Sequence, residues 1–181
     1  MALIAVLDNR EKRIITQRLV SAVKIRSDTA HPILNRAADY STVFLRTALG
    51  ISFLSGVADR FGLWGTYGQP NVAWGDFSRF IEYTGKLNWF APTAVIPALA
   101  WAATFAEILL GLALVLGFFT RVAALLSGLT LLVFALTMTF ALGVKAPLDF
   151  SVFSASAGAF LLAAYGKYPL SVDALRSRSS L

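Results

Sequence analysis

Two charged residues, Arg46 and Glu107, lie inside long apolar stretches of the chain. A charge near the middle of a bilayer costs at least about 3 kcal/mol, so Glu107 must be protonated, paired, or beside water or a ligand. At about 1.5 Å of rise per residue, the two Cα atoms differ in depth by about 8 Å, which two long side chains can cover. The sequence therefore favours a contact between Arg46 and Glu107. Arg60 is the alternative partner, because its side chain leans in the favourable direction but starts further away.

This charged pair is compatible with a structural role and with a functional one. A buried ion pair can hold two helices in register without carrying any chemistry. Alternatively, the polar centre can hold a ligand head group or relay protons, as ionisable residues within membranes often do. Trp101 and Thr104 lie near Glu107 in the same apolar stretch. Together with Arg46 they would provide an apolar slot with a few polar groups, which is what a quinone head group requires.

The composition argues against several other kinds of redox centre. The 181-residue chain has no cysteine and a single histidine, His31, which lies outside every apolar stretch. Iron–sulfur clusters, thiolate metal sites and a haem held by two membrane histidines are therefore not expected. Nor does the sequence suggest a metal site built from histidines and carboxylates. Any redox role would have to come through a bound quinone or a partner subunit.

Long apolar stretches must position these residues. Hydrophobic types make up 57% of the chain and charged types 14%, whereas a soluble domain carries about 25% charged residues. A membrane span needs about 20 apolar residues, and a helix satisfies all of its backbone hydrogen bonds in lipid. Four stretches meet or approach this length, and the fourth would need local bilayer thinning or cover from its neighbours. They cover about residues 42–63, 93–118, 122–144 and 150–165.

Each stretch carries small and polar residues on one helical face, at steps of three and four residues. Such faces allow membrane helices to approach closely and to form hydrogen bonds with one another. The sequence therefore predicts an all-α membrane protein built as a four-transmembrane-helix bundle. The four faces consist of Arg46, Gly50, Phe53, Val57 and Arg60; Ala100, Ala103, Thr104, Glu107 and Gly111; Ser127, Thr130, Phe134, Thr137 and Ala141; and Ser151, Ser154, Ala155, Gly158 and Leu162.

The basic residues predict the orientation of the bundle. The net charge of +6 does not indicate a nucleic-acid partner, because most basic residues flank apolar stretches instead of forming a polar patch. Lysine and arginine accumulate on the cytoplasmic side of membrane proteins. Seven of them lie on the side that holds both termini and three on the other, so both termini are expected in the cytoplasm. The seven are Lys24, Arg26, Arg36, Arg121, Lys167, Arg176 and Arg178, and the three are Arg79, Lys86 and Lys145.

The two ends of the chain lie outside the predicted membrane domain, residues 41–168. Residues 1–40 form a basic cytoplasmic segment whose start is too short and lacks the basic residue of a signal peptide. Within it, residues 13–26 mix apolar and basic types, which is typical of an amphipathic helix on a membrane surface or of a flexible basic tail. Residues 169–181 form a cytoplasmic tail.

The connection over residues 64–91 is the one sizeable outer loop of this arrangement and is rich in aromatic residues. Two interpretations are open, an aromatic belt at the membrane interface or a cover over a pocket that opens outward. Asp76 is expected to cap a short helix within this loop. The bilayer-facing side of that helix is predicted to contain Phe77, Phe80, Ile81 and Tyr83.

Two of the apolar stretches resemble the DoxX/DoxD family. Residues 45–56, which read LRTALGISFLSG, resemble the family's opening pattern of an arginine, a small and aliphatic helix and a glycine. Residues 106–114, which read AEILLGLAL, and residues 116–121, which read LGFFTR, are similar to its second signature. The resemblance covers about residues 40–167, and Asp59-Arg60 stands where family members usually have a basic residue.

The resemblance implies a multi-pass protein of the bacterial inner membrane, in a family where some members are subunits of thiosulfate:quinone oxidoreductases. The first functional hypothesis is a DoxX-like membrane subunit of a quinone-linked oxidoreductase, without catalytic residues, haem or metal of its own. In this hypothesis Arg46, Trp101, Thr104 and Glu107 bind the quinone. The alternative is a non-catalytic scaffold or assembly subunit of a larger membrane complex. Both hypotheses imply the lipid bilayer and other subunits as partners, and a solute or proton carrier fits less well.

Overall fold

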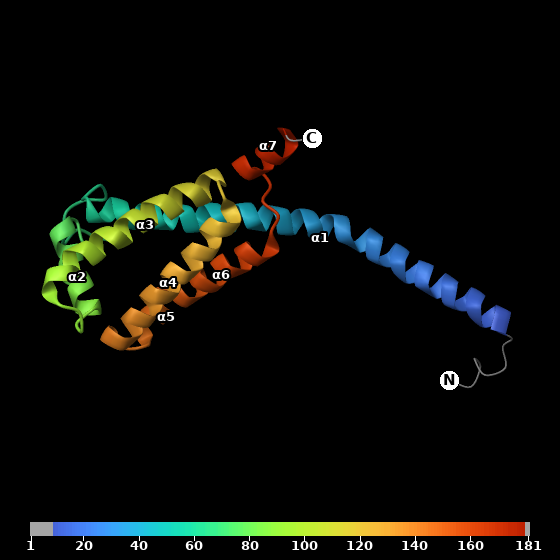
Figure 1. The fold of residues 1–181 in the computed structure, drawn as a ribbon, viewed down its shortest axis with the longest axis horizontal. Helices are drawn as coiled ribbons and strands as arrows, with labels where there is room; N and C mark the ends of the chain where they lie inside the picture. The colour runs from blue at the N-terminus through green and yellow to red at the C-terminus, as the bar shows by residue number, and fades with distance from the viewer. Residues whose placement is uncertain (1–8, 180–181) are drawn as a thin grey trace. The chain divides into compact units, whose positions relative to one another are not determined.

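The computed structural model describes residues 9–179, although not the side chains of residues 9–12, 16, 19–33, 35, 178 and 179. Every regular element in this range is a helix (Figure 1). Along the chain they are α1 (Asn9–Arg60), α2 (Phe77–Leu87), the 3₁₀ turn η2 (Thr93–Val95), α3 (Ile96–Leu116), α4 (Thr120–Leu142), α5 (Lys145–Asp149), α6 (Val152–Tyr165) and α7 (Val172–Ser179). The chain divides into two compact units, Met1–Tyr40 and Ser41–Leu181.

The first unit is helical from Asn9 onward. Ile14 and Ile15 are both exposed, beside the exposed Arg13 and Arg18. The other members of the predicted amphipathic pattern, Leu19, Val20, Val23, Lys24 and Arg26, have side chains outside the described residues. Residues 1–8, on which the signal-peptide prediction depends, also lie outside the described residues.

Among the described residues, three helical segments are long and apolar enough to cross a membrane, Arg36–Arg60, Thr93–Leu116 and Thr120–Leu142. They correspond to the first three predicted spans, which confirms an all-helical protein with candidate membrane-spanning helices. The fourth predicted span, residues 150–165, forms the shorter apolar helix α6 (Val152–Tyr165). Its 14 residues reach about 21 Å at about 1.5 Å per residue, less than the hydrocarbon thickness of a typical bilayer.

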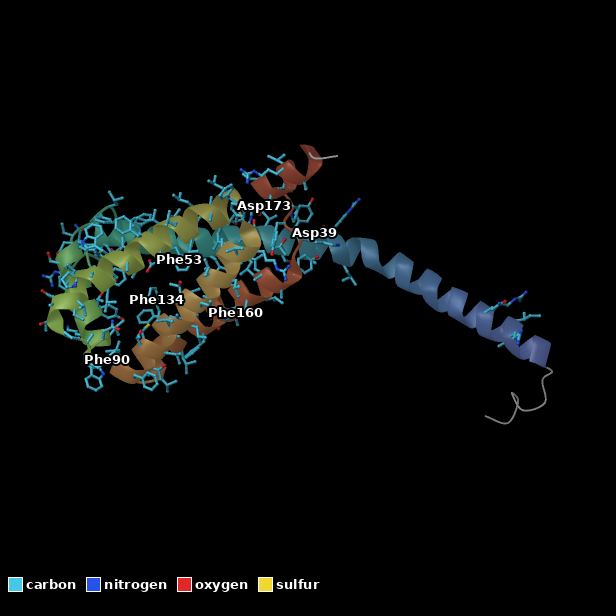
Figure 2. All side chains as sticks on the ribbon, in the orientation of Figure 1. Asp39, Phe53, Phe90, Phe134, Phe160 and Asp173 are labelled. Carbon is cyan, nitrogen blue, oxygen red and sulfur yellow. The ribbon has the colours of Figure 1, made fainter. Side chains whose placement is uncertain are left out.

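The core of the second unit is made by four helices, α1, α3, α4 and α6. A close contact joins α1 to α3, where a Cβ atom on Gly50 would lie 2.7 Å from the backbone oxygen of Gly111. Helix α6 packs along α4, and a Cβ on Gly128 of α4 would lie 2.8 Å from the ring of Phe160 (Figure 2). The buried core residues are Leu49, Phe53, Leu110, Leu114, Ala123, Ala124, Ala159, Leu162 and Ala163.

The predicted inward faces are confirmed for the first two helices and corrected in part for the last, while in α4 Ser127 is buried and the other four predicted residues are half-buried. In α1 all five predicted residues are buried, and in α3 four are buried and Ala103 is half-buried. For the last helix, the predicted Leu162 is buried, Ala155 packs against the core and Gly158 faces Leu45. However, Ser151, just before α6, and Ser154 are exposed, and the other buried residues of α6 are Ser156, Ala159 and Ala163. The hydroxyl of Ser156 donates to the backbone oxygen of Gly128, 2.8 Å away, which explains why this serine and not its neighbours faces α4.

The loop helix α2 begins where the sequence predicted. The Oδ1 of Asp76 accepts a hydrogen bond from the backbone N–H of Arg79, 3.0 Å away, which is the expected N-terminal cap. The predicted facing of the helix is wrong in one respect: Phe80 is buried against the protein and does not face the bilayer. Helix α2 therefore covers one end of the bundle, which we call the loop end.

Candidate functional site at the loop end of the bundle

The centre of the loop end is a buried ion pair between Arg60 and Glu107. The Nη2 of Arg60 donates to both carboxylate oxygens of Glu107, at 2.7 and 2.8 Å. Its Nη1 donates to the hydroxyl of Thr104 at 2.9 Å, and that hydroxyl donates in turn to the backbone oxygen of Ala100 at 2.8 Å. The side chains of Arg60 and Glu107 are each only 4% exposed. Charge-assisted bonds of this kind are among the strongest in proteins.

The predicted contact between Arg46 and Glu107 is wrong, and the direction of helical side chains explains why. Side chains lean toward the N-terminus of their own helix. Arg60 is the last residue of α1, so its side chain extends back into the bundle, while the side chain of Glu107 leans toward the start of α3. Because α1 and α3 run antiparallel, these two side chains converge. The lean of Arg46 carries it away from Glu107.

Arg46 instead holds the C-terminal segment at the opposite end of the bundle. Its Nη2 donates to the backbone oxygen of Leu170 at 2.9 Å. Close by, the carboxylate of Asp173 accepts hydrogen bonds from the backbone N–H groups of Phe119 and Thr120, at 2.9 and 2.7 Å (Figure 2). Burial raises the pKa of Asp173, but these hydrogen bonds and the charge of Arg176 outweigh burial and hold its pKa below the usual value. This arrangement ties the residues after α6 to the turn between α3 and α4.

Aromatic residues of the loop cover the ion pair. The guanidinium carbon of Arg60 lies 3.7 Å from the ring centroid of Phe80 and 5.4 Å from that of Trp74. Both distances are within the range of cation–π attraction. By contrast, Trp89 and Phe90, later in the same loop, are 72% and 68% exposed. One part of the loop therefore covers the bundle, whereas Trp89 and Phe90 are exposed, and their place in an interfacial belt stays a prediction.

Trp101 lies away from the ion pair, on the exposed side of α3. Its ring is 4.3 Å from that of Phe77 and 5.5 Å from that of Phe105, measured between centroids. Of the four residues predicted to bind a head group, the structure thus brings Thr104 and Glu107 together with Arg60. Arg46 instead bonds to Leu170, and Trp101 packs against Phe77 and Phe105.

An open pocket of about 360 Å³ lies beside the ion pair. We call it the loop pocket; it is lined by Ser55, Gly56, Asp59, Trp64, Asn71 and Trp74. The indole N–H of Trp64 contacts both the backbone oxygen and the hydroxyl of Ser55, at 3.1 Å each. Gly56 separates the pocket from the ion pair, because a Cβ on this residue would lie 3.7 Å from Oε2 of Glu107. The pocket therefore has aromatic walls and polar edges, and the backbone at Gly56 separates it from the buried carboxylate of Glu107.

The position of Asp59 in the pocket wall does not follow from the sequence. Its Oδ2 accepts hydrogen bonds from the backbone N–H groups of Ala73 and Trp74, both at 3.0 Å. Asp59 is only 6% exposed, although it is the penultimate residue of α1. The only sequence feature that could have indicated this role is the position of Asp59, which stands next to Arg60 at the end of an apolar stretch and before an aromatic loop. Asp59 thus fixes the loop against α1 and forms part of the pocket wall.

The described residues offer no group of three or more histidine, cysteine, aspartate or glutamate side chains placed to hold a metal ion. The lining of the loop pocket is suited to hydrogen bonding and stacking. Trp64 and Trp74 provide flat apolar surface, while Ser55, Asn71 and Asp59 provide donors and acceptors. The volume of this open pocket lies within the range of about 300–1,000 Å³ found for small-molecule sites.

Comparison with known proteins identifies one family. The DoxX family model matches residues 41–140, which include α1 from Ser41 onward, α2, α3 and most of α4. No curated protein and no solved structure matches the chain.

Proposed function

This chain belongs to the DoxX family, and from that premise we propose that it is the quinone-binding membrane subunit of a redox complex. Its apolar helices make it an integral membrane protein in contact with the lipid bilayer. The quinone would bind in the loop pocket, and the electrons would be exchanged with a partner subunit. The single observation that carries this proposal is the aromatic, polar-edged pocket beside the buried Arg60–Glu107 pair.

The residues of the loop pocket fit a quinone head group. A planar ring requires flat apolar walls, which Trp64 and Trp74 provide. Its carbonyl oxygens require hydrogen-bond donors, and the side chains of Ser55 and Asn71 can donate. When bound, a quinone supplies two-electron redox chemistry, and this chain's residues would orient the ring. Thr104 and Glu107 act as positioning residues, since they hold Arg60 beneath the loop that forms the pocket.

A variant of the pocket wall tests this proposal. Replacing Trp64 with alanine should raise the dissociation constant of a short-chain benzoquinone at least about tenfold, which equals about 1.4 kcal/mol. The measurement is titration calorimetry on the full chain in lipid nanodiscs. Trp64 is 63% exposed, so the fold should tolerate this change. Trp89→Ala is the matched control, because Trp89 is exposed in the same loop but outside the pocket, and it should change the constant by less than about twofold.

The contrary result would support the alternative role. If the unmodified chain shows no saturable quinone binding and quinone does not copurify from native membranes, the protein is better described as a scaffold or assembly subunit. One observation favours that alternative: Arg60 occupies both carboxylate oxygens of Glu107, as a purely structural pair would require. The aromatic loop or the basic helix before Ser41 would then contact the other subunits.

We also propose the topology of a four-span protein in the bacterial inner membrane. Helix α6 would be the fourth span, with its short length compensated by local thinning of the bilayer and by its packing along α4. The charge bias places both termini in the cytoplasm and the loop pocket on the outer side. A quinone tail would then leave the pocket toward the outer leaflet.

Cysteine labelling tests this topology on a chain that contains no cysteine of its own. Ser78, in α2, and Ser177, in α7, are both exposed, so neither substitution should disturb the core. In intact cells, a cysteine at position 78 should react with a membrane-impermeant maleimide and one at position 177 should not. Permeabilised cells are the control, since both positions should react there. Labelling of position 177 alone in intact cells would reverse the orientation.

A further inference from the structure

The loop pocket contains a buried hydrogen-bond acceptor that no described residue satisfies. Asp59 uses its Oδ2 to accept two backbone hydrogen bonds, from Ala73 and Trp74. Its Oδ1 is buried and has no hydrogen-bond partner among the described residues. A buried acceptor without a donor destabilises a protein, and more so when it is charged. A ligand that donates a hydrogen bond to this oxygen would recover that free energy.

The neighbouring cation does not supply the missing donor. Both terminal nitrogens of Arg60 are engaged, Nη1 with Thr104 and Nη2 with Glu107. Its Nε is buried and has no hydrogen-bond partner among the described residues, so it does not donate to Asp59 either. The indole N–H of Trp64, which is on the pocket rim, is engaged with Ser55. Asp59 therefore leaves the loop pocket with an unmatched acceptor and a negative charge, since the charges of Arg60 and Glu107 cancel.

We infer that the loop pocket binds the reduced, hydroquinone form of its ligand in preference to the quinone, with Asp59 accepting a hydrogen bond from a ring hydroxyl. This inference rests on the proposed quinone site. The two redox forms have the same ring and nearly the same shape, so the aromatic walls do not distinguish them. They differ at the oxygen atoms, because a hydroquinone hydroxyl can donate a hydrogen bond and a quinone carbonyl can only accept one. A carboxylate oxygen facing a carbonyl oxygen would be both unpaired and repelled.

The preference can be measured directly on the unmodified protein. Equilibrium binding of a short-chain benzoquinone and of its chemically reduced form, kept under argon, should give a dissociation constant at least about tenfold lower for the reduced form. For a two-electron couple, a tenfold difference raises the midpoint potential of the bound ligand by about 30 mV. A redox titration of the bound ligand is thus a second readout that does not depend on enzyme turnover.

The Asp59→Asn variant should reverse or abolish the preference. An asparagine keeps one side-chain oxygen, which can still accept from the backbone N–H groups of Ala73 and Trp74. Its amide nitrogen replaces the unpaired Oδ1 by a donor, which suits a quinone carbonyl. We therefore expect the ratio of the two dissociation constants to fall at least about tenfold. Asp76→Asn is the matched control, because this carboxylate caps α2 outside the pocket and asparagine caps equally well.

The outcomes separate this inference from the proposed function. If the unmodified protein binds neither redox form, the proposed quinone site is wrong. If it binds both forms equally, or binds the quinone more tightly, the site stands and the role of Asp59 is wrong. An unchanged ratio in a folded Asp59→Asn variant would likewise contradict the role of Asp59. The measurement on the unmodified protein decides the question even if the variant does not fold.

Discussion

Replacing Arg60 with methionine should lower the free energy of unfolding by about 3–5 kcal/mol, because the change leaves Glu107 buried and charged without a partner. Glu107→Gln should also destabilise the protein, since it leaves the guanidinium without its counter-charge. The double variant should recover a large part of the loss, because both buried charges are then removed together. Reversible unfolding in mixed micelles, followed by circular dichroism, measures all four free energies.

A second cycle on the same glutamate provides the matched control. Arg46 is as deeply buried as Arg60, but it bonds to Leu170 at the other end of the bundle. Arg46→Met and Glu107→Gln should therefore add within about 0.5 kcal/mol, as independent sites do. The Arg60 cycle should instead deviate from additivity by more than about 1 kcal/mol. Additive losses in the Arg60 cycle, or strong coupling in the Arg46 cycle, would contradict the geometry described above.

The sequence predicted that Glu107 is buried, but it did not predict which arginine pairs with it. The periodic faces of α1 and α3 were readable, since a helix places residues three and four apart on one side. Burial of Glu107 followed from the same pattern. The identity of its partner did not follow, because the prediction gave more weight to the depth of the Cα atoms than to the direction of the side chains. Depth favours Arg46, whereas direction favours Arg60. For long side chains in antiparallel helices, the direction decides which charges meet.

The loop pocket was harder to predict than the helices, for a different physical reason. Its wall depends on Asp59 accepting hydrogen bonds from residues 14 and 15 positions later in an irregular loop. It also includes Asn71, whose φ of 66° is a turn conformation that asparagine tolerates better than most residues. Neither feature has a periodic signature. The aromatic composition of the loop indicated that it would cover something, but not which rings would turn inward.

The prediction for α6 was wrong at its two serines for a third reason. Serines are small enough to lie in a helix contact and polar enough to face water, so Ser151, Ser154 and Ser156 were equally good candidates by type. Periodicity selected the first two. The structure selects Ser156, whose hydroxyl bonds to α4 while the other two are exposed. A short helix has few turns, so its apolar pattern does not determine which of two neighbouring faces is buried.

Placing a methyl group at Gly50 should destabilise the bundle, although alanine is the better helix former. A Cβ there would lie 2.7 Å from the backbone oxygen of Gly111 and 3.1 Å from the backbone nitrogen of Val115. Backbone atoms cannot rotate away, so α1 and α3 must separate at their closest contact. Overpacking of this kind costs about 1–3 kcal/mol, which exceeds the gain of about 1 kcal/mol in helix propensity. The same micelle unfolding assay measures the loss for Gly50→Ala.

Gly85→Ala is the control that separates the close contact from helix propensity. Gly85 is also helical, in α2, but its added Cβ would meet only the side chain of Ile96 at 3.5 Å, an ordinary contact. This substitution should therefore be neutral or stabilise the protein by up to about 1 kcal/mol. Opposite signs for the two alanine variants would establish that α1 and α3 touch through backbone at Gly50. If Gly50→Ala stabilises the protein as Gly85→Ala does, the two helices do not approach as closely as the structure places them.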